Sequence, residues 1–346
     1  MRFFSTEQVS KWHPDKYADQ ISDAILTAYL RQDKHAHVAV ETMVKGETVV
    51  LGGEITSTAN VSHKEIIQRV ADKLGYKVTE IIDLIGRQSP EINGAVGEAE
   101  GAGDQGMMFG FATDQTTSHL PLGFEIANSV IKAIEEDIET NPETILKGDA
   151  KCQVTMEDET YLRNILVSVC HKEGYAIEAV RNYVKHLIVD KMFPFYDDEQ
   201  TLDVFSILQV HPAGTWTIGG PAADCGLTGR KIVCDQYGGY CAVGGGAFSG
   251  KDPSKVDRSA AYMARKIAVD MVKKYGGDCE VQIAYAIGVA QPVSVSAQST
   301  RAGDLSDEVE KTYDLTPKGI IKALDLYNKD YEKIAEGCHF REGLWE

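Results

Sequence analysis

A glycine-rich stretch followed by lysines is the first part of the sequence that could do chemistry. Residues 244–259 read GGGAFSGKDPSKVDRS, and Gly245 to Lys251 fit G-x-x-x-x-G-K, the start of a phosphate-binding P-loop. The next position of that motif is Ser or Thr, whose hydroxyl holds Mg²⁺, but here it is Asp252. The preceding DQYGGYCAV is also a poor central strand. We therefore expect a flexible loop that leads into a helix, with Asp252 as N-cap and Pro253 as first helical residue, where an anion is favoured.

The segment HPDKYADQISD is a second candidate. Pro14 can begin a helix, with His13 just outside it and Asp15 in its first turn. A histidine and a carboxylate together at a helix start suit an acid or electrostatic group beside a metal ligand. Asp19 and Asp23 lie four and eight residues after Asp15, so the three form an acidic stripe along one side of the helix. For at least one of these two we expect a solvated acidic face.

Cations gather in glycine-rich segments of an otherwise acidic chain. A third segment, GGPAADCGLTGRK, joins a glycine-rich turn to Asp224, Arg230 and Lys231. Lys251 and Lys255 add two further cations, although the chain has 35 Lys and Arg against 52 Asp and Glu and a formal net charge of −17. This combination suits a di-metal, triphosphate-binding site, in which carboxylates hold Mg²⁺ and Lys and Arg neutralise the remaining charge.

The composition limits the classes of partner. The net negative charge argues against non-specific binding to nucleic acid, which needs a basic surface. No apolar run approaches the length of a membrane span, and the N-terminus lacks the apolar region of a secretion signal, so we expect a cytoplasmic protein with no membrane partner. The seven cysteines form no C-x-x-C pair, which favours reduced thiols over a zinc site or a disulfide framework.

Helices and strand pairs must position these segments. Apolar residues at helical spacing predict helices around 21–29, 63–75, 123–139, 174–189, 260–271 and 317–334. Alternating apolar and polar residues predict hairpins over 37–56, 153–172 and 280–298. Strand pairs with helices thus recur three times, which predicts an α+β chain of three similar layered units rather than an alternating parallel sheet. Taken alone, the glycine-rich residues 94–106 are either a linker or a mobile active-site loop.

Two long motifs are similar to those of a known family. GAGDQGMMFGFAT (101–113) and GGGAFSGKDPSKVDRSAAY (244–262) resemble the signature segments of S-adenosylmethionine synthetases, also called methionine adenosyltransferases. HPDKYADQISDAIL, VAVETMVKG, LGGEIT, ADCGLTGRKI and YAIGVA follow in the family's order, so the resemblance covers nearly the whole chain. It implies that ATP, L-methionine and water give S-adenosylmethionine, pyrophosphate and phosphate. The methionine sulfur would attack ribose C5′, and the released triphosphate would be hydrolysed before it leaves.

The resemblance also implies roles for individual residues. Three carboxylates would bind metals, two of them Mg²⁺ and the last K⁺: Asp15, Asp257 and Glu41. The residues that would act in catalysis are His13 (at the leaving oxygen), Asp104, Lys151, Arg230, Lys251 and Lys255. The residues that would bind ATP are His13, Asp149, Lys151, Trp216, Asp224, Arg230, Lys231, Ala247 and Lys251. The residues that would bind methionine are Glu54, Gln88, Asp224 and Lys255.

The implied architecture is an α+β fold of three similar βαβ-type subdomains related by a pseudo-threefold axis. On this chain we place an N-terminal subdomain at 1–93, a gating loop at 94–106, a central subdomain at 107–221 and a C-terminal subdomain at 222–346. The resemblance further implies a homodimer or homotetramer with active sites at the dimer interface.

The chain departs from the family pattern beside the histidine. Ser10-Lys11-Trp12 stands where Ser-Glu-Gly is usual, so either the local backbone differs or Trp12 fills space near the substrate. If the backbone there needed a positive φ, Trp12 would strain it. Thr215-Trp216 stands where Arg-Phe is common, and Trp216 can stack on adenine as Phe does.

Other functions stay open beside an active synthetase. The chemistry could act on a methionine analogue, because Trp12 changes the surroundings of the histidine. The chain could also be a non-catalytic nucleotide-binding homologue, although every charged catalytic position is present. A P-loop phosphotransferase is disfavoured by Asp252.

Overall fold

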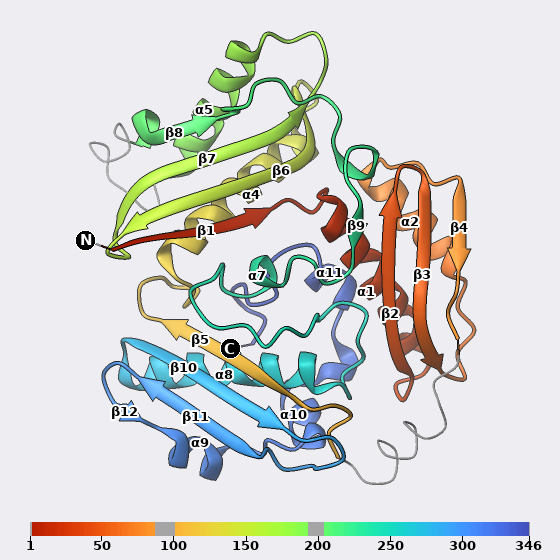
Figure 1. The fold of residues 1–346 in the computed structure, drawn as a ribbon, viewed down its shortest axis with the longest axis vertical. Helices are drawn as coiled ribbons and strands as arrows, with labels where there is room; N and C mark the ends of the chain where they lie inside the picture. The colour runs from red at the N-terminus through yellow and green to blue at the C-terminus, as the bar shows by residue number, and fades with distance from the viewer. Residues whose placement is uncertain (1, 87–100, 193–203, 346) are drawn as a thin grey trace.

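Three sheets surround a central region of the molecule (Figure 1). The computed structural model describes residues 2–86, 101–192 and 204–345. Within these residues each sheet has four strands, in the orders β4-β3-β2-β9, β1-β6-β7-β8 and β12-β11-β10-β5. Each sheet is built on one antiparallel hairpin. The hairpins are β2 (His37–Lys45) with β3 (Thr48–Thr56), β6 (Leu146–Glu157) with β7 (Tyr161–His171), and β10 (Asp278–Tyr285) with β11 (Ser294–Ser299).

A strand from a distant part of the chain completes one edge of each sheet. These antiparallel partners are β9 (Gly226–Leu227) on β2, β1 (Phe3–Val9) on β6 and β5 (Gly106–Thr113) on β10. The opposite edges are β4 (Glu80–Asp83), β8 (Leu208–Val210) and β12 (Gly303–Asp304). Because the strands are exchanged in this way, the segments 1–93, 107–221 and 222–346 divide the sequence but not the sheets.

A long helix precedes each hairpin and another helix follows it. The pairs are α1 (Pro14–Gln32) with α2 (His63–Leu74), α4 (Leu122–Thr140) with α5 (Ile177–Met192), and α8 (Val256–Tyr275) with α9 (Ser306–Thr312). The first helix of each pair packs its apolar side on the sheet that follows, α1 on β2, α4 on β6 and α8 on β10. The predicted α+β chain of three similar units is therefore confirmed.

The single helix predicted at 317–334 is wrong. The chain forms α10 (Pro317–Leu324), a short 3-10 turn η2 (Leu326–Asn328) and α11 (Tyr331–Ile334) instead. Asp325 ends α10 with φ of 49°, in the left-handed region that stops an α-helix. Apolar periodicity continued across this break because all three pieces bury side chains against the same core.

Among the described residues, the buried apolar side chains form two clusters. The larger one joins α1, α8 and the C-terminal segment, and the smaller one lies between α4, α5 and the β6–β7 hairpin. Two further short elements, η1 (Gly220–Ala222) and α7 (Ile232–Asp235), flank β9 and lead into the site. In the part of the chain that the structure describes, no helix combines the length and apolarity needed to cross a membrane.

Candidate active site

Three acidic residues on one side of α1 hold two glycine-rich loops. Asp15, Asp19 and Asp23 are all buried, and each accepts a hydrogen bond from a backbone N–H. The pairs are Asp15 with Leu227 N (2.9 Å), Asp19 with Gly229 N (2.9 Å) and Asp23 with Gly250 N (2.8 Å). The solvated acidic face expected for at least one of Asp19 and Asp23 is therefore wrong, because the loops cover both.

Each of these carboxylates also has a cationic partner. The ion pairs are Asp15 with Lys231, Asp19 with Lys16 (3.2 Å) and Asp23 with Arg258 (2.6 and 2.7 Å). Burial alone would raise the pKa of the Asp15 carboxyl, but hydrogen bonds from Lys231 and Leu227 N hold that pKa below its usual range. Asp15 is therefore an anion at neutral pH.

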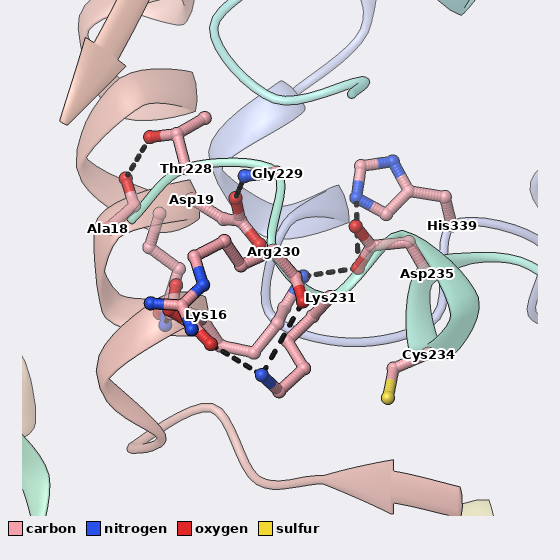
Figure 2. A network of polar contacts seen from close by, with 12 residues as sticks. Lys16, Ala18, Asp19, Thr228, Gly229, Arg230, Lys231, Cys234, Asp235 and His339 are labelled. Atoms are coloured by element: carbon pink, nitrogen blue, oxygen red, sulfur yellow. Dashed lines mark hydrogen bonds and ion pairs between the residues drawn. The ribbon is translucent and has the colours of Figure 1, made fainter. Parts of the chain in front are cut away.

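Lys16 connects α1 to the short helix α7 (Figure 2). Its Nζ lies 2.6 Å from Asp235 Oδ1 and 3.2 Å from Asp19 Oδ2. Burial raises the pKa of both carboxyls. Burial also holds the pKa of the neighbouring His339 well below its ordinary value, so this ring is neutral. The loop that carries Arg230 and Lys231 is thus fixed on both sides, at Gly229 by Asp19 and at α7 by Lys16.

His13 stands at the N-terminus of α1 as a neutral donor. It is the N-cap residue before Pro14, as the sequence predicts, and its Nδ1 accepts a hydrogen bond from Asp15 N (3.1 Å). Burial, with Lys231 and Lys151 nearby, lowers the pKa of His13 to about 3. Because Nδ1 accepts from a backbone N–H, the neutral ring carries its proton on Nε2. His13 can therefore offer an uncharged N–H to a developing anion.

Asp252 does not cap α8, and Pro253 is not its first residue. The helix begins at Val256, and the buried Asp252 carboxylate accepts hydrogen bonds from Val38 N (2.7 Å) and Ser254 N (2.8 Å). The Asp-Pro pair thus makes a turn that attaches the loop to β2. Local sequence indicated a helix start, but the contact with β2 could not be foreseen from spacing.

The two glycine-rich loops meet beside these lysines. A Cβ placed on Gly229 would lie 2.4 Å from the Cβ of Ala247, so the loops are in direct contact there. Lys251 forms an ion pair with Asp257 in the first turn of α8. Lys255 lies 2.7 Å from Asp252. The predicted phosphate-binding lysines of both loops therefore belong to one region.

The β6–β7 hairpin contributes Asp149 and Lys151. Asp149 is buried, and its Oδ2 accepts a hydrogen bond from Gly220 N (2.7 Å). Burial raises the pKa of this carboxyl to about 6. The other oxygen, Oδ1, has no partner among the residues that the structure describes. Trp216 is half-buried on the segment whose backbone pairs with His171 at the end of β7. The Lys151 side chain, on β6, is exposed.

The structure does not bring every predicted residue into this region. Asp224 and Arg230 are exposed on the loop itself. No hydrogen bond or ion pair within the described ranges links Glu41, Glu54 or Asp104 to the cluster, and all three are exposed. Gln88, and residues 94–100 of the expected gating loop, lie outside the described residues.

Sequence reasoning missed three buried groups: Lys16 and Arg258, which pair with Asp19 and Asp23, and Asp235, which pairs with Lys16. Two of them stand inside motifs already singled out, Lys16 in HPDK and Arg258 in KVDRS. A cation one helical turn from an acid is usually a surface pair, so spacing alone gave no sign of burial. Their role follows only from the loops that cover α1.

Trp12 points into the core rather than into a substrate pocket. Its side chain is 6% exposed, and Nε1 donates a hydrogen bond to Leu74 O (3.1 Å). The ring faces Gly148, where an added Cβ would lie 2.7 Å from Trp12 Cγ. Trp12 is not among the described residues with positive φ, so the strain that a replaced glycine would cause does not occur.

Comparison with known proteins decides the family. Models of the N-terminal, central and C-terminal domains of S-adenosylmethionine synthetase match residues 1–91, 99–216 and 218–346. The chain belongs to the S-adenosylmethionine synthetase family. The resemblance inferred from the motifs is confirmed, and so is the expectation that the chain is an enzyme of the methionine adenosyltransferase class.

Relatives support this family over nearly the full length. The chain is 40% identical to the S-adenosylmethionine synthase of Sulfurovum sp., over 99% of this chain and 95% of the relative. It is 42% identical to that of Salinibacter ruber, over 97% and 92% of the two chains. A structure described as an unusual S-adenosylmethionine synthetase from Campylobacter jejuni matches with a TM-score of 0.88 at 33% identity, over 97% of this chain and 94% of that one. The three-domain fold is therefore that of the family.

The donor atoms of this region fit the Mg²⁺ ions that family membership suggests. Mg²⁺ prefers carboxylate oxygens and is usually held by one or two of them together with substrate phosphates. Asp15 and Asp257 offer such oxygens, and in this structure a lysine ammonium neutralises each of them. No group of three or more His, Cys, Asp and Glu side chains in the described ranges could hold a metal alone. This donor set matches ions that arrive with a polyphosphate.

Proposed function

We propose that this chain forms S-adenosylmethionine from ATP and L-methionine and then hydrolyses the released triphosphate to pyrophosphate and phosphate. The observation that carries this proposal is the neutral, buried His13 at the start of α1, with Lys231 beside it and Lys151 close enough to lower its pKa. Such a group of donors suits a polyanion that leaves in the reaction.

In the first step the methionine sulfur uses a lone pair to form a bond to ribose C5′. The bond from C5′ to the triphosphate oxygen breaks, and its electron pair stays on that oxygen. His13 donates its Nε2–H to the oxygen, and Lys231, Lys251 and Lys255 offset the phosphate charge. Because a thioether is a modest nucleophile, positioning and leaving-group stabilisation supply the rate.

Bound Mg²⁺, held by Asp15 and Asp257, would neutralise phosphate charge and orient the chain of phosphates. In the second step a water oxygen bonds to a terminal phosphorus of the released triphosphate, within the same set of lysines. The bond from that phosphorus to its bridging oxygen breaks, which leaves phosphate and pyrophosphate, and the proton of the water passes to solvent. Adenine would stack on Trp216, with Asp149 and Asp224 near the nucleoside. The proposed methionine contacts are Glu54, Gln88, Asp224 and Lys255, and Glu41 would bind K⁺. We further propose a cytoplasmic homodimer or homotetramer whose active sites lie between subunits.

One incubation tests the reaction. The chain is mixed with ATP, L-methionine, Mg²⁺ and K⁺, and the products are read by mass spectrometry and phosphate analysis. Equal amounts of S-adenosylmethionine, pyrophosphate and phosphate are expected. Consumption of ATP without formation of S-adenosylmethionine would instead favour another thioether as the substrate, and no consumption of ATP would favour a binding role.

Lys251→Ala tests the triphosphate role within the same assay. The substitution removes a cation from the loop and leaves Asp257 without its ammonium partner. We expect turnover to fall by about a hundredfold, the size of effect seen when one group that stabilises a developing oxyanion is lost. Turnover within a few-fold of the wild type would refute this role.

A further inference from the structure

Two strands of the central unit, β6 and β7, hold the residues from Trp216 to Gly220, which we call the nucleobase shelf. Lys147 Nζ donates to Thr217 O (2.7 Å), and Gly220 N donates to Asp149 Oδ2 (2.7 Å). Both partners come from β6. The shelf is therefore attached to the β6–β7 hairpin along its length, although it follows β8 in the sequence.

His171, the last residue of β7, holds the start of the shelf. Its backbone N donates to Trp216 O (3.0 Å), and Trp216 N donates to its ring Nε2 (3.2 Å). The indole is fixed in turn, because Trp216 Nε1 donates to Ile218 O (2.7 Å). One fully buried histidine thus makes both hydrogen bonds that place the backbone of Trp216.

The geometry admits only one form of the His171 ring. The Trp216 backbone N–H can only donate, so Nε2 must be an unprotonated acceptor. Nδ1 lies 2.9 Å from Lys172 O, and because a carbonyl can only accept, Nδ1 must carry a proton and donate it. The ring is therefore neutral with its proton on Nδ1, and no other tautomer satisfies both partners.

A second histidine supports this arrangement from the other side. The His211 ring meets the His171 ring edge to face, with centroids 5.6 Å apart. His211 has φ of 49°, and its carbonyl accepts a hydrogen bond from Arg181 Nη2 (2.8 Å). Burial lowers the pKa of His211 to about 4, so this ring is neutral where it packs on His171.

We propose that His171 is a positioning residue for the nucleobase of ATP: it sets the height and tilt of Trp216, on which adenine stacks. This inference rests on the proposed function, in which Trp216 is the stacking residue. His171 is fully buried, so it offers no surface to a substrate. Its effect should therefore fall on substrates that carry a base and spare those that consist of phosphate alone.

Inorganic tripolyphosphate separates a positioning role from a structural one. It offers the same phosphates as the released intermediate but has no adenine. His171→Phe keeps a ring of similar volume against His211 and removes both ring hydrogen bonds. His171→Gln keeps an acceptor that can reach the Trp216 N–H. His186→Phe, an exposed histidine on α5 in the same unit, is the matched control.

We expect His171→Phe to raise the KM for ATP about tenfold, as for the loss of one buried hydrogen bond, with the KM for methionine and the rate of tripolyphosphate hydrolysis unchanged. His171→Gln should recover the ATP KM to within about threefold of the wild type, and His186→Phe should match the wild type. An equal fall in both activities of His171→Phe would make His171 merely structural and overturn the inference. An unchanged ATP KM would also overturn it.

The wild-type chain separates this inference from the proposed function. If it forms no S-adenosylmethionine, the proposed function fails and the inference fails with it. If it forms the product normally while His171→Phe binds ATP normally, only the role of His171 is refuted.

Discussion

Substitution of Trp12 tests whether its side chain belongs to the core or to a substrate pocket. Truncation to alanine removes a side chain that is 6% exposed, together with its hydrogen bond to Leu74 O. Core Trp→Ala substitutions cost about 3–5 kcal/mol, and the carbonyl left without its donor adds about 1 kcal/mol. Part of the cavity opened against Gly148 can close, so we expect a loss of about 4 kcal/mol in the free energy of unfolding.

This loss is measurable by urea and thermal unfolding of the ligand-free protein. Trp12→Phe keeps much of the ring volume but not the N–H, so its loss should be about 1–2 kcal/mol. At temperatures where Trp12→Ala stays folded, the ratio of kcat/KM for methionine to that for its S-ethyl analogue should not change. Trp216→Ala is the control among the three tryptophans, because it should alter ATP kinetics with little effect on stability.

A double-mutant cycle with Gly148 adds a geometric check. Gly148→Ala places a Cβ 2.7 Å from Trp12 Cγ and also strains a backbone with φ of 120°. The strain persists without the indole but the clash does not, so the two substitutions together should cost about 1 kcal/mol less than their sum. If Trp12→Ala leaves stability unchanged and shifts the preference between methionine and its analogue, the placement of Trp12 in the core is refuted.

Two further substitutions probe the loops and the surroundings of Lys11. Gly229→Ala should lower kcat at least tenfold, because its Cβ would lie 2.4 Å from the Cβ of Ala247 and push the two loops apart. Gly75 has a similar positive φ but open space around it, so the control Gly75→Ala should cost only about 1 kcal/mol of stability. Equal kinetics for the two variants would exclude the loop contact. Burial raises the pKa of Glu135 from 4.5 to about 7. Between these two pH values the folded chain holds a proton that the unfolded chain has lost, so the free energy of unfolding falls as the pH rises from 4.5 to about 7. Glu135→Gln keeps an acceptor for Lys11 N (2.7 Å) and should raise Tm near pH 8 but not near pH 4, so an equal shift at both would argue against this titration.

The fold was predictable where the signals are local. Helices on either side of a hairpin follow from periods of 3.6 and 2 within some twenty residues, which is why the three units could be counted from sequence. The edge strands β1, β5 and β9 could not be assigned, because each pairs with a strand far away in the chain and no local pattern encodes that partner. The same limit produced the wrong helix at 317–334, since one left-handed residue, Asp325, interrupts an unbroken apolar pattern.

The structure brings together residues that the motifs singled out, but their contacts could not be predicted. His13, Asp15 and the lysines of two loops lie in one region, as expected if a polyanion requires gathered cations. They could not reveal that Asp19 and Asp23 are buried, since an acidic stripe on a helix is usually exposed. Asp19 and Asp23 are buried because the two glycine-rich loops cover α1, and these loops are far from α1 in the sequence.

The spacing of the acidic stripe explains how α1 sets the geometry of the loop that carries Arg230 and Lys231. Asp15 and Asp19 are four residues apart, which is about 6 Å along a helix axis. Their partners, Leu227 N and Gly229 N, are two residues apart where β9 ends in a turn, and each lies 2.9 Å from its carboxylate. The donors of the loop therefore match the carboxylates of α1 in order along the helix, with both bonds formed.

A slip of the loop by one residue would break this match. It would move the loop by about 3.3 Å along α1 and leave two buried carboxylates facing the wrong groups. Buried ion pairs contribute little net stability compared with apolar contacts of the same volume, whereas an unpaired buried carboxylate costs about 3–5 kcal/mol. The stripe therefore penalises misplacement of the loop far more than it stabilises the fold. That is the property a site needs if Lys231 is to meet a leaving phosphate oxygen beside His13.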